Sequence, residues 1–235
     1  MTQRTVVILP TYNEKETLPQ VAGAVRRLGF DVIVVDDNSP DGTGAIADRL
    51  AASDPHLTVI HRPGKLGLGS AYVAAFRAGL ERGYRLFVEM DADGSHRIEH
   101  LPGIISAAEA GGGIGLGSRY IEGGAVAGWG WHRRFLSWGA NVYCRALLGL
   151  SVHDCTSGFR CYTRPVLEAI GLERVISDGY SFQIEMVYLA TRRGYLVVEV
   201  PILFEDRVAG ASKVTRGEIV TDFLSVIRMR LHSGR

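Results

Sequence analysis

Segments with the character of buried strands alternate with segments of helical periodicity through the first half of the chain. Apolar runs of strand length occur at Thr5–Leu9, Asp31–Val35, Leu57–Ile60, Leu86–Met90 and Ile114–Gly117. Helical patterns separate them, as over residues 17–28, where apolar side chains recur at the spacing of one helix face. Strands separated by helices of this kind form βαβ units. The sequence therefore predicts an α/β fold with a mainly parallel sheet flanked by helices.

Acidic residues follow two of these predicted strands. Asp91 and Asp93 come directly after Met90, and Asp36 and Asp37 follow the second strand. The carboxyl ends of parallel strands meet at one edge of the sheet, where α/β proteins bind their ligands. Alternation of side chains along an extended strand would put Asp91 and Asp93 on the same side. Because neighbouring carboxylates repel one another, the pair is a candidate site for a divalent cation with oxygen ligands.

Composition limits the class of protein. The chain has 235 residues, of which 46% are hydrophobic and 22% charged, and no linker or repeat divides it, so we expect a single domain over 1–235. A formal net charge of +1 gives no reason to expect nucleic acid as a partner. No apolar run is long enough to span a bilayer, and Met1 leads directly into a strand pattern, so no signal peptide is expected. Three cysteines without zinc-ligand spacing favour reduced thiols.

The chain lacks the glycine-rich loops with which many nucleotide-binding proteins hold phosphate. The turn after the first strand reads Pro10-Thr11-Tyr12-Asn13-Glu14, without the Gly-x-Gly-x-x-Gly of dinucleotide-binding folds. Gly64-Lys65 lacks the upstream glycine of a phosphate loop. What remains is an acidic edge beside Tyr12, a side chain that can stack on a base. This combination suggests a nucleoside-diphosphate site in which a divalent ion neutralises the pyrophosphate.

Five motifs spread over essentially the whole chain point to one family. They are Ile8–Glu14, Val34–Thr43, Met90–His96, Gly117–Tyr120 and Ser157–Arg160. In type and order they resemble the polyprenol-phosphate (dolichol-phosphate) mannose synthases, which are inverting family 2 glycosyltransferases of the GT-A fold. The resemblance implies GDP-mannose as donor, a polyprenol or dolichol phosphate as acceptor and a divalent metal, Mg²⁺ or Mn²⁺, as cofactor. It also implies a nucleotide-binding half, 1–118, and an acceptor-binding half, 119–235.

The resemblance assigns roles residue by residue. The residues implied for guanosine and ribose are Pro10, Tyr12, Glu14, Val35 and Asp37. Those implied for the metal and the pyrophosphate are Asp91 and Asp93, with Ala92 lining the site and Ser95 where some members carry a further metal ligand. Those implied for the acceptor phosphate are Arg119, Arg133 and Ser137, and those for a loop closing over the donor are Arg207 and Lys213.

A lipid phosphate is already ionised near neutral pH, so it needs no strong general base. Catalysis then requires in-line positioning and stabilisation of charge on the departing GDP. We assign these tasks to the four catalytic candidates, Asp91, Asp93, Arg119 and Arg133, and single displacement predicts inversion.

Three alternatives stay open at this point. The enzyme could transfer glucose from UDP-glucose to polyprenol phosphate, or use a hydroxyl acceptor, for which Asp154 is the nearest candidate base. It could also be a nucleotide-sugar-binding regulator without turnover.

Sequence features in the second half of the chain predict that the protein contacts a membrane. We expect a cytoplasmic protein that is peripheral on the cytoplasmic face of a membrane, bound to the lipid surface or to a membrane-embedded partner. A terminal amphipathic helix, 218–231, suits either membrane docking or packing on the core. Trp129 and Trp131 stand in a glycine-rich segment and suit the core or a lipid-facing flap. A helix is predicted from Phe135 to Leu148, and Glu185 is expected to pair with an arginine.

Overall fold

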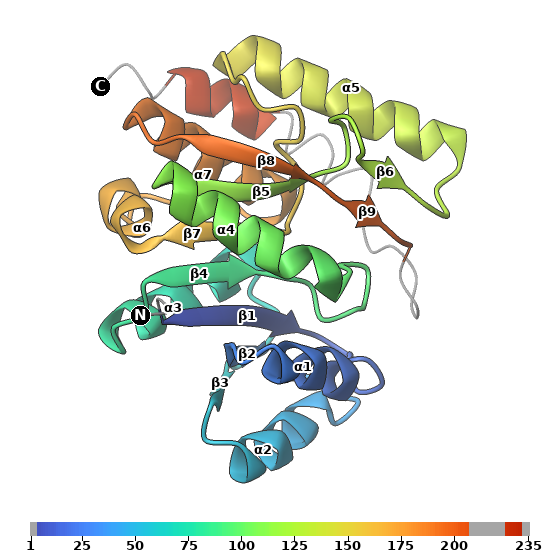
Figure 1. Ribbon diagram of the computed structural model, residues 1–235, viewed down its shortest axis with the longest axis vertical. Coiled ribbons are helices and arrows are strands. Elements are labelled where there is room, and N and C mark those ends of the chain that lie inside the picture. The colour runs from blue at the N-terminus through green and yellow to red at the C-terminus, as the bar shows by residue number, and fades with distance from the viewer. Residues whose placement is uncertain (1–3, 207–223, 232–235) are drawn as a thin grey trace.

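The computed structural model describes residues 4–206 and 224–231. Its central feature is a seven-stranded sheet with the strand order β3-β2-β1-β4-β7-β5-β8 (Figure 1). The strands of this sheet are β1 (Thr5–Thr11), β2 (Asp31–Asp36), β3 (Leu57–His61), β4 (Leu86–Glu89), β5 (Ile114–Ser118), β7 (Arg160–Thr163) and β8 (Val197–Pro201). A second, two-stranded sheet pairs β6 (Ala125–Val126) with β9 (Leu203–Phe204).

The sheet is parallel except at one strand. β1 pairs in parallel with β2 and β4, β2 with β3, and β5 with β8. β7 runs antiparallel between β4 and β5. The predicted α/β class with a mainly parallel sheet is therefore confirmed.

Helices cover both faces of the sheet (Figure 1). They are α1 (Leu18–Arg27), α2 (Thr43–Ser53), α3 (Leu68–Glu81), the 3-10 turn η1 (Ile98–His100), α4 (Leu101–Gly111), α5 (Trp131–Leu148), α6 (Arg164–Ile170) and α7 (Gly179–Arg192). Residues 224–231 are also helical. None of the helices within 4–206 and 224–231 is long and apolar enough to cross a membrane.

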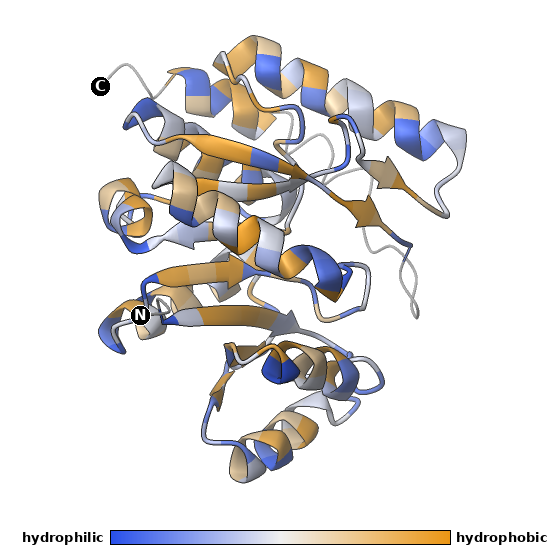
Figure 2. Ribbon diagram, viewed as in Figure 1, coloured by the Kyte–Doolittle hydropathy of each residue, from blue (hydrophilic) through white to orange (hydrophobic). Residues whose placement is uncertain are grey.

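Two hydrophobic cores form because side chains alternate along the buried strands. Val7 and Leu9 of β1 belong to the core shared with α1, α2 and α4. Val6 and Ile8 belong to the core shared with α3, α6 and α7. Figure 2 shows the corresponding hydrophobic colouring of the strands at the centre of the molecule. The three cysteines are free and buried.

Helix α5 differs from its predicted bounds. This helix begins at Trp131, four residues before the predicted start, because Gly130 supplies the extended residue that precedes the first helical turn. As a result Trp131 and Arg133 lie on the helix and not on a flexible segment. The first part of the predicted terminal helix, 218–223, and the centre of the predicted donor loop, with Arg207 and Lys213, lie outside the described residues.

Candidate active site

The two acid-rich strand ends lie at the same edge of the sheet. β1 is hydrogen-bonded to β2 on one side and to β4 on the other, and all three strands run in the same direction. Asp37 donates its backbone N–H to the carbonyl of Thr11 at 3.1 Å, which ties the ends of β1 and β2 together. Asn13 and Asn38, just beyond these strands, have left-handed backbones with φ of 62° and 56°. Such conformations in residues other than glycine are uncommon and are enriched at functional sites.

Asp91 and Asp93 lie on a tight turn, not on the strand itself, because β4 ends at Glu89. The prediction that strand alternation puts both side chains on the same side therefore does not apply to them. Instead the turn is held by its own polar groups. The backbone N–H of Asp91 donates to Nδ1 of His96 at 3.0 Å, and the backbone N–H of Ser95 donates to Oδ1 of Asp93 at 3.0 Å. The left-handed backbone of Gly94, with φ of 79°, closes the turn.

His96 holds this turn in place through its contacts with Asp91. Because its Nδ1 accepts a hydrogen bond, the neutral ring carries its proton on Nε2, which lies 3.8 Å from Oδ2 of Asp91. The imidazole is buried and stacks on Phe159, with ring centroids 4.7 Å apart. His96 thus fixes the position of Asp91, a role that the sequence alone did not indicate.

The turn has the donor set of a divalent-metal site. The hydroxyl of Ser95 is buried and has no hydrogen-bond partner among the described residues, which is costly unless a ligand satisfies it. The side chain of Asp91 is about a third exposed, at 32%, so one carboxylate faces solvent. Within the described residues no three His, Cys, Asp or Glu side chains cluster closely enough to enclose a metal. Two carboxylates with a hydroxyl suit an ion such as Mg²⁺ that takes further oxygens from a bound phosphate.

A buried polar cluster lies next to the turn. Glu89 is fully buried at the end of β4, opposite Arg160 in the β4–β7 register. Burial raises the pKa of Glu89 to about 7, and Arg160 opposes that shift. Arg160 is itself fully buried and donates to the backbone carbonyls of Cys155, Ser157 and Gln183.

The predicted nucleotide residues gather at the ends of β1 and β2. Asp37 forms a two-point ion pair with Arg62, whose Nε lies 2.5 Å from Oδ1. Arg62 also donates to the carbonyl of Gly67 at the start of α3. The ammonium of Lys65 lies 5.5 Å from the centre of the Tyr12 ring. The remaining predicted nucleotide-binding residues are the half-buried Pro10, the buried Val35, and Glu14. The carboxylate of Glu14 accepts a hydrogen bond from the Thr17 hydroxyl.

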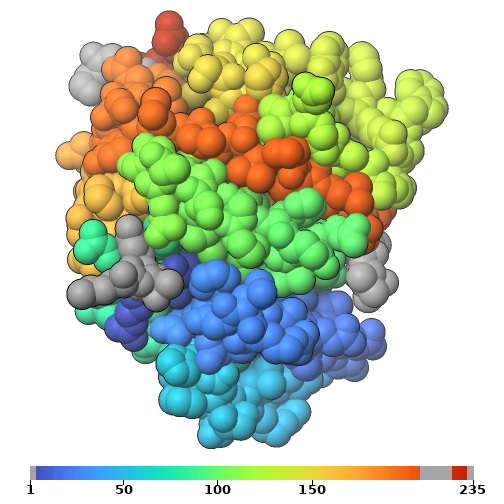
Figure 3. Space-filling model, in the orientation of Figure 1, coloured from blue at the N-terminus to red at the C-terminus, as the bar shows by residue number. Residues whose placement is uncertain are grey.

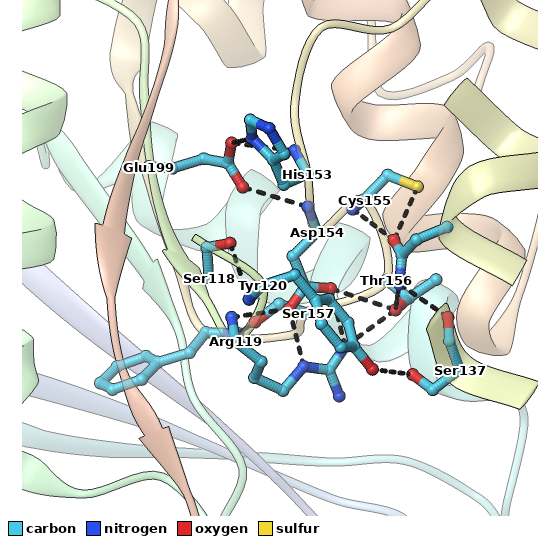
Figure 4. A network of polar contacts seen from close by, with 12 residues as sticks. Ser118, Arg119, Tyr120, Ser137, His153, Asp154, Cys155, Thr156, Ser157 and Glu199 are labelled. Atoms are coloured by element: carbon cyan, nitrogen blue, oxygen red, sulfur yellow. Dashed lines mark hydrogen bonds and ion pairs between the residues drawn. The ribbon is translucent and has the colours of Figure 1, made fainter. Parts of the chain in front are cut away.

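Arg119 lies just beyond β5 in a buried polar network (Figure 4). Its Nε and Nη2 donate to the two oxygens of Asp154, each at 2.7 Å, and Nη2 also reaches Thr156. Burial alone would raise the pKa of Asp154, but the Arg119 guanidinium outweighs burial and lowers it. Glu199 of β8 accepts the backbone N–H groups of His153 and Asp154, at 2.8 and 3.0 Å, and so fixes the segment that carries this carboxylate. Nη1 of Arg119 takes no part in the contacts to Asp154 and Thr156.

This network rules out one sequence-based candidate role. Asp154 is fully buried and bound through both oxygens to Arg119, so it is not accessible as a general base for a hydroxyl acceptor. Among residues 4–206 and 224–231, the contacts of the Glu185 carboxylate are the backbone N–H groups of Ile176 and Ser177, not the expected arginine.

Trp129 joins the two predicted acceptor arginines. Its ring centre lies 5.5 Å from the guanidinium carbon of Arg119 and 3.9 Å from that of Arg133. Arg133 also pairs with Asp206 at 3.1 Å. Ser137, one turn along α5, accepts a hydrogen bond from the Tyr120 hydroxyl at 2.7 Å. The structure thus places the three predicted acceptor residues around one aromatic cluster.

Phe204 connects this cluster to the acidic turn. Its ring lies 5.6 Å from the Arg119 guanidinium, 5.4 Å from the Trp129 ring and 5.7 Å from the His96 ring. The backbone of Phe204 also forms an isolated bridge with His96. A continuous row of ring contacts therefore runs from the two arginines to the residue that holds Asp91.

Comparison with known proteins bears on what such a site does. The family model described as glycosyl transferase family 2 matches residues 6–171. A polyprenol monophosphomannose synthase from Mycolicibacterium smegmatis is 50% identical and covers 100% of this chain and 91% of its own length. An undecaprenyl-phosphate mannosyltransferase from Micrococcus luteus is 46% identical, with 97% of this chain and 94% of the relative covered.

Solved structures share the fold at lower identity. Glucosyl-3-phosphoglycerate synthase from Mycobacterium tuberculosis, in complex with Mn²⁺, UDP-glucose and glycerol 3-phosphate, matches with a TM-score of 0.65 at 19% identity, covering 98% of this chain and 80% of that one. A mannosyltransferase from Pyrobaculum calidifontis in complex with GDP-Man and Mn²⁺ matches with a TM-score of 0.60 at 21% identity, covering 97% and 65%. These matches confirm the GT-A fold.

Proposed function

The chain belongs to glycosyltransferase family 2, and from this premise we propose that it transfers mannose from GDP-mannose to a polyprenol phosphate, with inversion. The observation that carries the proposal is the row of contacts from the acidic turn to Arg119 and Arg133. A nucleotide-sugar transferase acting on a phosphate needs a site for a pyrophosphate beside a cationic site for a second phosphate. In our proposal this row of contacts joins the pyrophosphate site at the acidic turn to the phosphate site at the two arginines.

The nucleotide end lies over β1 and β2. In our proposal the guanosine and ribose contact Pro10, Tyr12, Glu14, Val35 and Asp37. Tyr12 supplies a flat ring on which the base can stack, and Arg62 holds the Asp37 carboxylate in a fixed orientation. The close approach of the β1 and β2 ends supports this assignment, because it gathers these side chains at one edge.

Asp91 and Asp93 would hold the divalent metal, with the unpartnered Ser95 hydroxyl as a further ligand and Ala92 lining the site. Mg²⁺ or Mn²⁺ bound there supplies positive charge that stabilises the departing diphosphate. His96 keeps the Asp91 carboxylate in place through the backbone of that residue. Arg207 and Lys213, which lie outside the described residues, would close over the donor.

The acceptor phosphate would bind between Arg119 and Arg133, near the hydroxyl of Ser137. Asp154 holds two of the Arg119 nitrogens, which leaves Nη1 to donate to a phosphate oxygen. Charge-assisted hydrogen bonds of this kind orient an ionised phosphate for in-line attack without a general base. The inaccessibility of Asp154 favours a phosphate acceptor over a hydroxyl acceptor.

A lipid acceptor places the enzyme at a membrane surface. We propose that it is peripheral on the cytoplasmic face, bound either to lipid or to a membrane-embedded partner.

Incubation with labelled GDP-mannose and polyprenol phosphate, followed by extraction into organic solvent, tests the function. We expect label in the organic phase in the presence of divalent metal and none after chelation. Unlabelled GDP should compete and UDP should not. Label transfer from UDP-glucose, blocked by UDP, would instead support the glucosyltransferase alternative.

A further inference from the structure

α5 exposes large apolar side chains on a side that does not face the fold. Its inner side packs through Asn141, Cys144 and Leu148. A second set, which we call the outer stripe, consists of Trp131, Phe135, Trp138 and Val142. These residues recur at intervals of four, three and four positions, which places them along one side of a helix.

The outer stripe is strongly exposed. Trp131 is 71% exposed, Phe135 63% and Trp138 52%. A surface helix normally turns its large apolar side chains toward the core, and contiguous exposed apolar patches mark interaction sites. Figure 1 shows α5 along one end of the molecule, and in Figure 3 its side chains form the outline of that end.

The charge on α5 indicates the kind of partner. Between Trp131 and Leu148 the helix carries Arg133, Arg134 and Arg145 and no acidic residue. The helix over residues 224–231 lies at the same end of the molecule and adds exposed leucines and the cations Arg228 and Arg230. Aromatic side chains with basic residues and no acidic ones are typical of helices that lie in the interface of an anionic bilayer.

We propose that the outer stripe of α5 is the surface by which this enzyme docks on an anionic lipid bilayer. The helix lies in the plane of the interface, with the outer stripe in the boundary between headgroups and acyl chains. Arg133 and Ser137 then face the active site from the same helix that touches the membrane. The inference rests on the proposed function in one respect, since a polyprenol phosphate holds its phosphate at headgroup level.

The geometry makes this arrangement useful. An interfacial helix enters the bilayer by about 5–10 Å, which is comparable with its own diameter. A lipid phosphate at headgroup level would thus meet the side of α5 that carries Arg133, with little displacement from the membrane. Trp129 is not part of this lipid-facing surface. Its ring packs against the Arg133 guanidinium inside the site and not on the outer stripe.

Vesicle flotation of the full chain tests the proposal. Vesicles of phosphatidylcholine, with and without phosphatidylglycerol, are compared for three proteins. The test variant carries Trp131→Ser, Phe135→Ser and Trp138→Ser. The matched control carries Leu28→Ser, Ile176→Ser and Leu196→Ser, three exposed apolar residues outside α5. The parent and the control should float with the anionic vesicles, less so at high salt, and the test variant should bind at least tenfold more weakly.

Quenching by brominated lipids gives an independent readout that requires no triple variant. The chain has three tryptophans, so paired Trp→Phe changes leave one reporter at a time. Trp131 and Trp138 should be quenched strongly in anionic vesicles and Trp129 weakly. Circular dichroism checks that each variant is folded, and single Trp131→Ser and Phe135→Ser changes replace the triple variant if it is not.

The outcomes separate this inference from the proposed function. Unchanged flotation of a folded test variant, or equal quenching of all three tryptophans, would overturn the docking surface. So would a parent that binds no vesicles and forms a dimer which the test variant lacks, since the outer stripe would then join two copies. Transfer of mannose to a short-chain, water-soluble prenyl phosphate should be the same in parent and test variant. If the parent floats but transfers nothing to that acceptor, the proposed function fails and the docking surface stands.

Discussion

At the scale of single residues, the site depends on side chains that hold other side chains. Asp154 fixes Arg119, His96 fixes Asp91 and Arg62 fixes Asp37. Arg119 and Asp154 are 35 residues apart and Arg62 and Asp37 are 25 apart, so the chain gives no local signal of these two pairings. The family resemblance named the arginine but not the carboxylate on which its orientation depends.

Replacement of Asp93 by asparagine should reduce mannose transfer about 10²–10³-fold, which is the usual effect of removing one electrostatic contribution to a transition state. The neutral amide would bind a divalent metal poorly, while its oxygen can still accept the Ser95 N–H that holds the turn. Rates at saturating metal and melting curves check this. Asp48→Asn, at a surface carboxylate that pairs with His61, is the control. An Asp93→Asn enzyme with more than half of the parental rate would contradict the metal role.

Replacement of Asp154 by asparagine should destabilise the protein by about 3 kcal/mol and lower Tm by roughly 6–12 °C, because it leaves the Arg119 charge buried and unpaired. The pKa of Asp154 is lowered in the folded protein. Its stabilising effect is therefore present above the ordinary value of 3.8 and is lost as the pH falls through the folded pKa. The difference in unfolding free energy between parent and variant should shrink below about that pH.

The same variant should raise KM for the acceptor more than it weakens GDP binding. Glu199→Gln is the matched control, because Glu199 contacts the backbone of the same segment without touching Arg119. An unchanged acceptor KM in the Asp154→Asn enzyme would show that Asp154 stabilises the fold without positioning Arg119.

At the scale of elements, the sequence predicted well the positions of those strands and helices that have a periodic pattern of apolar residues. The first five strands were predicted to within two residues at each end, because each is an apolar run closed by polar or glycine residues. The two-residue strands β6 and β9 carry no periodic signal and were not predicted. The direction of β7 was not predicted either, since no local pattern distinguishes a parallel from an antiparallel partner. The contact of Phe204 with His96 is made by one of these unpredicted strands, β9.

Replacement of Arg133 by alanine should weaken binding of the polyprenol phosphate about tenfold while sparing GDP, as expected for loss of one charge-assisted hydrogen bond. Arg133 lies in the first turn of α5 against Trp129, and its only ion pair within the described residues is with Asp206. Calorimetry with GDP and kinetics with the acceptor separate the two effects. Arg134→Ala is the control, since Arg134 donates to the carbonyl of Val126. An equal loss of GDP affinity would argue against an acceptor site at Arg133.

At the scale of the whole molecule, the two halves share one sheet. β5 belongs to residues 1–118, yet both of its neighbours, β7 and β8, come from the second half. β4 likewise pairs with β7 on one side. We therefore propose that the chain is a single folding unit, although in our proposal its two halves bind different substrates.

A fragment of residues 1–118 should fail to fold alone, because β4 would have an unpaired edge and β5 would have no neighbour. Co-expression with residues 119–235 should restore a soluble, GDP-binding complex. Circular dichroism and calorimetry of the fragment check this. A cooperative melting transition of the isolated fragment would show that the nucleotide-binding half is a separate domain.

The position of β7 also constrains how the protein forms during synthesis. β4 leaves the ribosome with residue 89, but the strand that pairs with its free edge is complete only at residue 163. At about 5–20 residues per second, that edge stays open for roughly 4–15 s. An open apolar edge is a template for wrong pairing with another chain. The order of the strands along the chain thus makes the nascent protein a candidate client for chaperones over that interval, while the finished sheet has this edge covered.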